Sequence, residues 1–204
     1  MSKVVITGGS GDIAGAIAAQ MRGLGCEVFT PTRAELNVAN IKSVQDYFAK
    51  TTPDILINNA GAIVLDAIAH NDIAAHKNVI DVNLAGVFAC VGALLRANKN
   101  AKIVNIGSSA GTKIHANWSS YCATKAAVIM ATACWAAEGI DAVCISPGRT
   151  LTKMRKSMYP CEDPASLMSP EDFAKAVVAI IQRGYERGAN IDVNLHNVKE
   201  FINE

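Results

Sequence analysis

Thr7-Gly8-Gly9-Ser10-Gly11-Asp12-Ile13-Ala14 follows the β-branched run Val4-Val5-Ile6 and precedes an alanine-rich helical pattern that ends near Arg22. A second apolar run, Glu27-Val28-Phe29-Thr30, comes next. This order predicts a strand, a glycine-rich turn, a helix and a second strand. Glycines at such a turn let the backbone approach a pyrophosphate, and the helix N-terminus supplies N–H groups and a positive dipole end. The stretch therefore favours a dinucleotide-binding turn over an ordinary strand-to-helix turn.

The rest of the chain repeats the alternation of strands and helices. Continuous apolar runs are found at 55–58, 102–106 and 142–145, and a last strand is expected near 190–194. Helical patterns separate them near 41–50, 70–97, 117–138 and 170–183. Strands that are apolar throughout are typical of a parallel sheet buried on both faces. We therefore expect one domain, residues 1–204, with a doubly wound α/β fold, helices on both faces and ligands beyond the carboxyl ends of the strands.

Composition excludes several classes of function. The 204 residues are 50% hydrophobic, enough for a sizeable core, and carry a formal net charge of +1, which gives no electrostatic footprint for nucleic acid or an anionic membrane. Apolar stretches are broken by polar residues, so a cytoplasmic protein is expected. The six cysteines are scattered without a Cys-x-x-Cys pair, which predicts neither disulfides nor a metal site. Cys122 is expected to be a packing residue.

Tyr121 and Lys125 are four residues apart in a helical stretch, so their side chains share one face. A neighbouring ammonium favours the phenolate form of a tyrosine, whose ordinary pKa is ~10. Alone, the pair indicates a solvated helix face more often than an acid/base site.

The end of the second strand bears on the choice of nucleotide. An acidic residue there would bind the ribose 2′-hydroxyl of NAD, and a basic one the 2′-phosphate of NADP. The sequence has Arg33 and no carboxylate before Glu35, which favours NADP and leaves NAD possible.

Several further motifs fall in a fixed order along the chain. They are Asn58-Asn59-Ala60-Gly61, Asn83, Ser108, Tyr121 with Lys125, and Pro147-Gly148 followed by Thr152. With the glycine-rich turn, they make residues 3–193 closely resemble the short-chain dehydrogenase/reductase family, which has the Rossmann fold.

The resemblance implies a catalytic role for four residues. Tyr121 would be the general acid/base, Lys125 would lower its pKa and hold the nicotinamide ribose, Ser108 would orient the substrate oxygen, and Asn83 would support a water-linked proton relay. Bringing a phenol from ~10 to ~7 needs about 4 kcal/mol, more than one partly solvated ammonium supplies. A second positive charge, such as an oxidised nicotinamide ring, would help.

The resemblance also implies a cofactor site. Its residues would be Gly8, Ser10, Gly11, Asp12, Ile13, Arg33, Asn37, Asn59, Ala60, Gly61, Tyr121, Lys125, Pro147, Gly148 and Thr152, and Asn58 would also line the adenosine side. Asp12 and Ala14 stand where the family turn has its second and third glycines. Asp12 is expected to cap N–H groups at this helix start, although a carboxylate near the phosphates would weaken cofactor binding. The chain also lacks much of one crossover, and 36–38 is expected to be all that remains of a third strand.

Residues 149–170 correspond to the family's mobile substrate lid. This segment is basic and rich in methionine, which suits an anionic or amphipathic substrate as well as it suits a solvated helix face with methionines packed beneath it. His115 and Trp118 are further pocket candidates. The stretches 82–95 and 126–137 are apolar nearly all round, and family members bury these helices between subunits, so a homodimer or homotetramer is expected.

The leading prediction is therefore an oxidoreductase that transfers a hydride between NADP and a small carbonyl or alcohol, with no nucleic-acid or membrane partner. Two alternatives stay open. One is a sensor or regulatory protein that binds NAD(P) and keeps the fold, for which Asp12 is the main hint. The other is an epimerase or dehydratase, against which the short C-terminal region counts.

Overall fold

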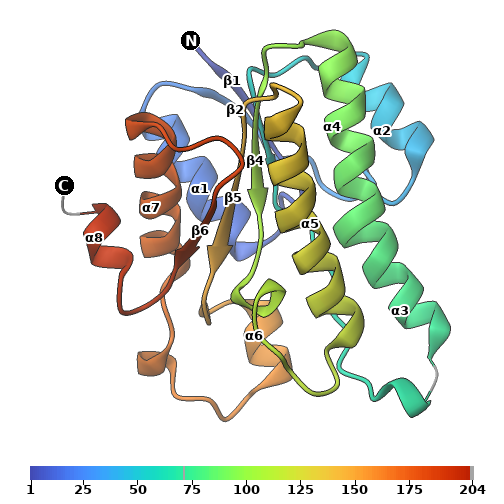
Figure 1. Cartoon of the computed structure of the whole chain (residues 1–204). Helices are drawn as coiled ribbons and strands as arrows, with labels where there is room; N and C mark the ends of the chain where they lie inside the picture. Colours follow the sequence, from blue (N-terminus) through green and yellow to red (C-terminus); the bar gives the residue numbers. More distant parts are fainter. Residues whose placement is uncertain (71, 203–204) are drawn as a thin grey trace.

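The computed structural model describes residues 1–70 and 72–202, and its centre is a six-stranded parallel sheet in the order β2-β1-β3-β4-β5-β6 (Figure 1). The strands are β1 (Lys3–Ile6), β2 (Glu27–Phe29), β3 (Ile55–Asn58), β4 (Lys102–Ile106), β5 (Ala142–Pro147) and β6 (Asn190–Val193). The strand order reverses between β1 and β3, because β2 lies on one side of β1 and all later strands on the other. This is the position at which doubly wound folds bind ligands.

Helices cover both faces of the sheet, as the apolar runs predict. On one face lie α1 (Asp12–Gly23), α7 (Pro170–Arg183) and α8 (Val198–Ile202), and on the other α2 (Ile41–Phe48), α4 (Gly86–Ala97) and α5 (Ser119–Ala137) (Figure 1). Successive residues of each strand point to opposite faces of the sheet: Val4 packs against α1 and α7, and Val5 packs under α2 and α4. Two hydrophobic cores therefore hold the sheet between them.

One long helical segment runs from Ile73 to Ala97. It consists of α3 (Ile73–Ile80), a π-helical turn (Asp81–Ala85) and α4. By length and composition alone it could cross a membrane, which the sequence analysis did not anticipate. In this fold it is a core helix, because Val87, Cys90, Val91 and Leu94 are buried against the sheet layer.

Three details differ from the sequence-based expectations. Residues 36–38 form no strand, so the expected third strand is wrong, and α2 alone connects β2 to β3. Leu36 and Val38 instead pack as buried loop residues in the core under α2 and α4. The short helices α6 (Lys153–Met158) and α8 were not predicted, because six and five residues are too few to show a helical period.

Candidate active site

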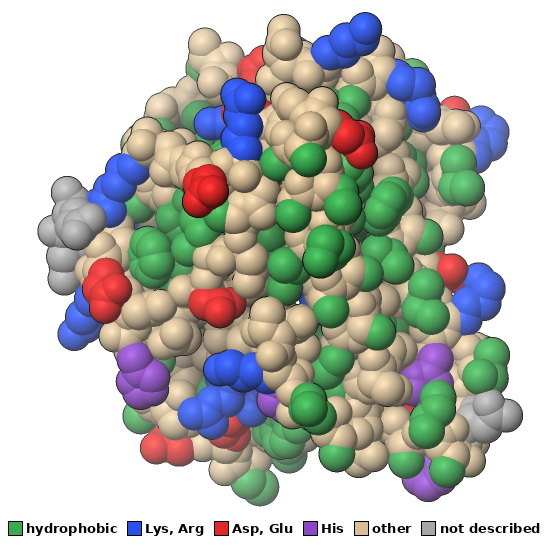
Figure 2. Space-filling view, viewed as in Figure 1, with side chains coloured by type: hydrophobic (Ala, Val, Ile, Leu, Met, Phe, Trp, Pro, Cys, Tyr) green, Lys and Arg blue, Asp and Glu red, His purple; other side chains and the backbone are tan. Residues whose placement is uncertain are grey.

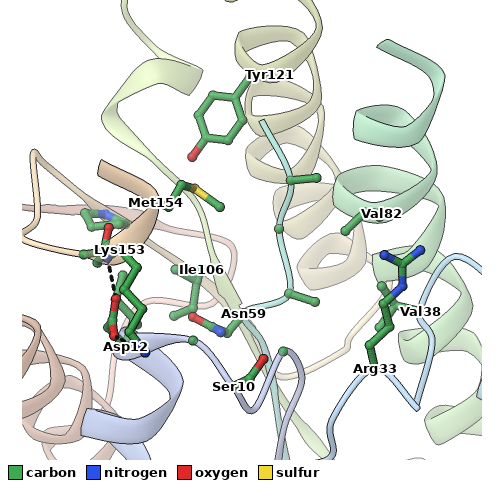
Figure 3. Close-up of a pocket in the computed structure, with 18 of the residues that line it drawn as sticks. Ser10, Asp12, Arg33, Val38, Asn59, Val82, Ile106, Tyr121, Lys153 and Met154 are labelled. Carbon is green, nitrogen blue, oxygen red and sulfur yellow. Dashed lines mark hydrogen bonds and ion pairs between the residues drawn. The ribbon is translucent and has the colours of Figure 1, made fainter. Parts of the chain in front are cut away.

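The carboxyl ends of β1, β3, β4 and β5 open into a cavity of about 380 Å³ at the point where the strand order reverses (Figure 3). The glycine-rich turn, the Asn-Asn-Ala-Gly block, the end of β4 and the start of α6 contribute its walls. It is lined by Gly8, Ser10, Gly11, Asp12, Ile13, Arg33, Leu36, Asn37, Val38, Asn59, Ala60, Gly61, Ala62, Asn78, Val82, Ile106, Gly107, Tyr121, Lys125, Pro147, Thr152, Lys153 and Met154.

The glycine-rich turn is packed tightly against the end of β3. Gly8 has a φ of +70°, and a Cβ there would lie 2.8 Å from the Ala60 Cα. The Thr7 hydroxyl accepts hydrogen bonds of 3.0 Å from the N–H groups of both Asn59 and Ala60. These bonds fix the Asn-Asn-Ala-Gly block beside the turn, which is a role for Thr7 that the sequence analysis missed.

The turn also fits an anionic cofactor. Gly11 is the N-cap residue of α1, and as a glycine it has no side chain to cap the N–H groups of the first turn of that helix. Uncapped N–H groups at the positive end of a helix are the donors that pyrophosphate needs. A Cβ at Gly11 would lie 3.2 Å from the Gly8 carbonyl oxygen, so the small residue also preserves the cradle.

Most of the predicted cofactor residues do line this cavity. Gly148 is the exception: it lines an adjoining cavity instead. Asn58 lines neither of the two, because it is buried and its Nδ2 donates to the Asn105 Oδ1 at 2.9 Å, while the Asn105 Nδ2 donates to the Thr132 hydroxyl at 2.8 Å. Asn58 therefore joins β3, β4 and α5 through a buried polar chain, and its expected place on the adenosine side is wrong.

Asp12 does not cap its own helix, which corrects the expectation for this residue. Its Oδ2 accepts a hydrogen bond of 2.6 Å from the main-chain N–H of Lys153, the first residue of α6 (Figure 3). The Lys153 Nζ lies 3.8 Å from the Asp12 Oδ1. Asp12 therefore links the glycine-rich turn to α6.

At the other end of the cavity lies the exposed side chain of Arg33 (Figure 3). Among the described residues, no hydrogen bond or ion pair engages its guanidinium. The carboxylate of the nearby Glu35 accepts two bonds of 2.8 Å from Thr32, which lower the pKa of Glu35. Asn37 also lines the cavity, with its Oδ1 accepting a bond of 3.2 Å from the Ala39 N–H. A cationic group is thus available at this end.

Lys125 is buried on α5, and its Nζ donates a hydrogen bond of 2.7 Å to the Ile106 carbonyl oxygen. Burial lowers the pKa of this lysine to about 8. The Nζ lies 5.8 Å from the centre of the Tyr121 ring. The predicted pair does share one face of a helix.

Tyr121 lines both cavities, and its hydroxyl points into the space beside Met154 (Figure 3). Burial raises the pKa of this phenol, and a hydrogen bond with the Ser108 side chain opposes the shift. A role for Lys125 in lowering the pKa of Tyr121 stays a prediction. A protonated phenol is suited to donating a proton.

Ser108 lies at the end of β4 and lines the adjoining cavity with Tyr121. Its hydroxyl oxygen accepts a bond of 3.1 Å from the Ala110 N–H, as a cap of the short 3-10 turn that begins at Ser109. A serine hydroxyl that accepts from the backbone still has its proton to donate. Ser108 can therefore cap the turn and donate to a substrate oxygen.

Asn83 is buried in the π-helical turn and lines neither of these two cavities. Its amide donates to the Ala62 carbonyl at 2.9 Å and to the Thr124 hydroxyl at 3.2 Å, and its Oδ1 accepts from the Ala62 N–H at 2.7 Å. The side chain thus ties the long helix to α5 and to the loop after β3. A proton-relay role for Asn83 stays a prediction.

The adjoining cavity, of about 200 Å³, has an aromatic wall. Trp118 stacks on His115 with ring centres 4.8 Å apart and meets Tyr121 edge-on at 5.8 Å. Tyr159, the residue after α6, completes the wall, with its ring centre 6.4 Å from that of Trp118. Met154 and Met158 complete the apolar part of the lining.

The positive charges of segment 149–170 are partly compensated. The Arg155 guanidinium makes two hydrogen bonds, of 2.6 and 2.8 Å, to the Glu162 carboxylate and lies 4.1 Å from the Tyr159 ring centre. Arg149 donates to the same carboxylate at 3.2 Å. Met168, counted with the segment from sequence, is fully buried in the core instead.

Comparisons with known proteins agree with this geometry. Residues 41–163 match the family described as short chain dehydrogenase. A 3-oxoacyl-(acyl-carrier-protein) reductase of Synechocystis sp. is 33% identical over 171 residues, which cover 78% of this chain and 68% of that protein.

Solved structures of similar shape include proteins with nicotinamide cofactors. A 4-hydroxyisoleucine dehydrogenase complexed with NADH is 25% identical, has a TM-score of 0.81 and aligns over 95% of this chain and 96% of its own. ElxO with NADP bound has a TM-score of 0.83 over 95% of this chain and 97% of its own, but at 22% identity it supports the fold alone.

Proposed function

The chain belongs to the short-chain dehydrogenase/reductase family, and from this premise we propose that it reduces a small carbonyl compound with NADPH, with Tyr121 as the proton donor. As a member of this family it is an NAD(P)-dependent oxidoreductase. The observation that carries the proposal is the position of Tyr121 in the wall shared by the two cavities, one fitted to a dinucleotide and one lined by aromatic rings.

Each residue of the site has a separate role in the proposed reaction. A bound reduced nicotinamide supplies the hydride. Tyr121 donates a proton to the carbonyl oxygen, and Ser108 donates a hydrogen bond to that oxygen as negative charge develops on it. Lys125, held by the Ile106 carbonyl, presents its ammonium to the nicotinamide ribose. The raised pKa of Tyr121 supports reduction, since the acid must carry its proton.

NADP is proposed over NAD because of Arg33. Its exposed guanidinium lies at the end of the cavity that is opposite Tyr121, and Thr32 holds the Glu35 carboxylate. A guanidinium without an internal partner is suited to a 2′-phosphate. Relatives of similar shape contain either NADH or NADP, so the preference depends on this residue.

The proposed substrate is a small uncharged ketone or aldehyde with a flat apolar part. The adjoining cavity, of about 200 Å³, suits a small molecule, and the rings of Trp118, His115 and Tyr159 offer it a stacking surface. The Glu162 carboxylate pairs with Arg149 and Arg155, so these two cations favour an anionic substrate less than the basic sequence of 149–170 suggests. We also propose that residues 149–170 act as the substrate lid of a single domain.

A homodimer or homotetramer in the cytoplasm is proposed as the working form. Apolar side chains gather on the surface formed by α4 and α5 (Figure 2). Phe88 is 49% exposed while its ring lies 5.0 Å from that of Trp135 on α5, and Met130 is 66% exposed. Large exposed apolar side chains on adjacent helices support a subunit interface. Light scattering coupled to gel filtration would measure the assembly directly.

Separate titrations with NADPH and NADH, followed by a panel of small carbonyl compounds, test the proposed function. We expect NADPH to bind more tightly and to be oxidised with at least one uncharged ketone, and Tyr121→Phe to lose turnover by a factor of ~10² or more with little change in cofactor affinity. If neither cofactor binds, the proposal is wrong. Binding without turnover over the whole panel would favour a sensor. Asp12, the main hint of a sensor in the sequence, bonds to the Lys153 N–H, which gives this carboxylate a structural role instead.

A further inference from the structure

Asp12 lies at a junction between two parts of the site that are far apart in sequence. It is in the glycine-rich turn, at a position lining the cofactor cavity, and its carboxylate bonds to Lys153 at the start of α6, 141 residues later. The side chain is 25% exposed. A carboxylate at this place needs a physical explanation, because the cavity is fitted to phosphates.

Segment 152–167 has few polar attachments to the rest of the described chain. Its base is closed by main-chain bonds: Leu151 donates to the Met168 carbonyl at 2.9 Å, and Met168 donates to the Arg149 carbonyl at 3.0 Å. Within residues 1–70 and 72–202, the hydrogen bonds and ion pairs that reach from 152–167 to the chain outside 149–168 go to Asp12. The ring contact of Tyr159 with Trp118 is a further, apolar attachment. Asp12 is therefore the polar contact that holds α6 over the cavity.

The effect of the Asp12 charge on binding of an anionic cofactor depends on the position of α6. With α6 in place, the Lys153 N–H and its ammonium, 3.8 Å away, take up the carboxylate charge. With α6 displaced, the bare carboxylate would stand beside Gly11 and the N-terminus of α1, where it would oppose the cofactor phosphates. An anionic cofactor then binds better to the closed form than to the open one.

We propose that Asp12 is a positioning residue that couples closure of segment 152–167 to binding of the dinucleotide. The proposal rests on the cofactor site of the proposed function. Because coupling between two events is reciprocal, a bound cofactor must favour the closed position of α6 as much as closure favours the cofactor. Asp12 itself makes no contribution to holding the cofactor.

Two measurements test the proposal. Hydrogen–deuterium exchange of the peptide covering α6, with and without NADPH, reports how firmly α6 is held, and NADPH titrations report the cofactor affinity. In the cofactor-free protein, Asp12→Ala removes the acceptor and should speed exchange in 153–158 about tenfold, the effect expected for one charge-assisted hydrogen bond. NADPH should bind this variant as tightly as the wild type or more tightly, since the opposing charge is gone, and should slow exchange in α6 less. Asp12→Asn keeps an acceptor oxygen without the charge, so α6 should stay protected while the effect of NADPH on it shrinks.

Lys153→Ala is the matched control, because it removes the ammonium and keeps the N–H that Asp12 accepts from. Without cofactor its exchange should lie close to that of the wild type, because the Lys153 side chain is 85% exposed and its ion pair at 3.8 Å is weak beside the N–H bond of 2.6 Å. Unchanged exchange in cofactor-free Asp12→Ala would overturn the proposal, as would an NADPH affinity weakened tenfold in that variant, which would make Asp12 a cofactor ligand. Failure of the wild type to bind NADPH or NADH would overturn the proposed function instead, and the exchange comparison without cofactor distinguishes the two failures.

Discussion

The Lys125 ammonium donates a hydrogen bond of 2.7 Å to the carbonyl oxygen of Ile106 at the carboxyl end of β4. This bond joins the helix that carries Tyr121 to the sheet edge where the cofactor cavity opens. Burial lowers the pKa of Lys125 to about 8, so the fold stabilises the charged lysine poorly. A buried cation with such a cost is typical of a functional site.

Lys125→Met should therefore abolish turnover without destabilising the protein at neutral pH. The lowered pKa corresponds to about 3 kcal/mol against the charged form, and the lost hydrogen bond to about 1 kcal/mol. Between pH 8 and 10.5 the unfolded wild type binds more protons than the folded one, so wild-type stability rises with pH and the advantage of the variant should narrow. Urea unfolding at several pH values measures both effects. The exposed Lys113→Met is the control, and a variant less stable than it at pH 7 would contradict the argument.

Tyr121 should keep its proton in the cofactor-free protein at a pH where an ordinary tyrosine begins to ionise. Its pKa is raised because it is buried, and the Ser108 hydrogen bond offsets this only in part. Oxidised cofactor brings a positive charge and should lower the pKa. Ultraviolet difference spectra of the wild type minus Tyr121→Phe, recorded against pH with and without oxidised cofactor, isolate this phenol. Ionisation below pH ~10 without cofactor would show the assigned direction to be wrong.

Arg33→Asp should weaken NADPH binding by a factor of ~10–100 and leave NADH binding nearly unchanged. The physical reason is that only NADPH has a 2′-phosphate to lose a guanidinium partner. Fluorescence titration of both cofactors gives the two affinities. Lys99→Asp makes the same change of charge in the connection between α4 and β4, away from the cavity, and should affect both cofactors equally little. Equal weakening of NADPH and NADH by Arg33→Asp would remove the basis for the NADP preference.

Gly8→Ala should be more harmful than Gly25→Ala, although both glycines have a left-handed φ, of +70° and +78°. Each substitution brings a backbone cost of ~1–2 kcal/mol. Only at Gly8 would the new Cβ also meet Ala60, at 2.8 Å from its Cα, whereas Gly25 has nothing within 4 Å. Thermal unfolding should therefore show a modest loss of stability for Gly25→Ala and a larger loss for Gly8→Ala, and NADPH affinity should fall only in Gly8→Ala. Equal losses would show that the close packing at Gly8 has no energetic consequence.

The strands and the cavity could be predicted from sequence because each depends on local patterns. Buried parallel strands require continuous apolar runs such as 102–106, and their shared direction brings the residues that follow them to one edge. Tyr121 and Lys125 meet because one helix holds them at a spacing of four. The resemblance then assigned roles to positions that the pattern had already brought together.

The partners of particular side chains could not be predicted in this way. Asp12 bonds to an N–H that is 141 residues away, and nothing near Asp12 in the sequence distinguishes this from capping its own helix. Asn58 and Asn59 are neighbours, yet one faces the buried layer and the other the cavity, because successive residues at a strand end point to opposite sides. The raised pKa of Tyr121 depends on burial, which spacing to Lys125 does not reveal.

Ser120→Ala should destabilise the protein by ~1–3 kcal/mol, because His76 is buried and depends on Ser120 for its hydrogen bond. The His76 Nδ1 lies 2.9 Å from the Ser120 hydroxyl, while its Nε2 faces the Asp66 Oδ2 at 3.8 Å and neither of those two atoms has a hydrogen-bond partner in the described chain. Removing the hydroxyl would leave both ring nitrogens unpaired.

Because Ser120 immediately precedes Tyr121, the first turn of α5 should also be held less firmly, so kcat should fall several-fold while NADPH affinity is unchanged. Urea unfolding and steady-state kinetics of Ser120→Ala and of the exposed neighbour Ser119→Ala measure this. Comparable stability and kcat in the two variants would mean that His76 finds another partner. It would also mean that the contact of His76 with Ser120 on α5 does not position Tyr121.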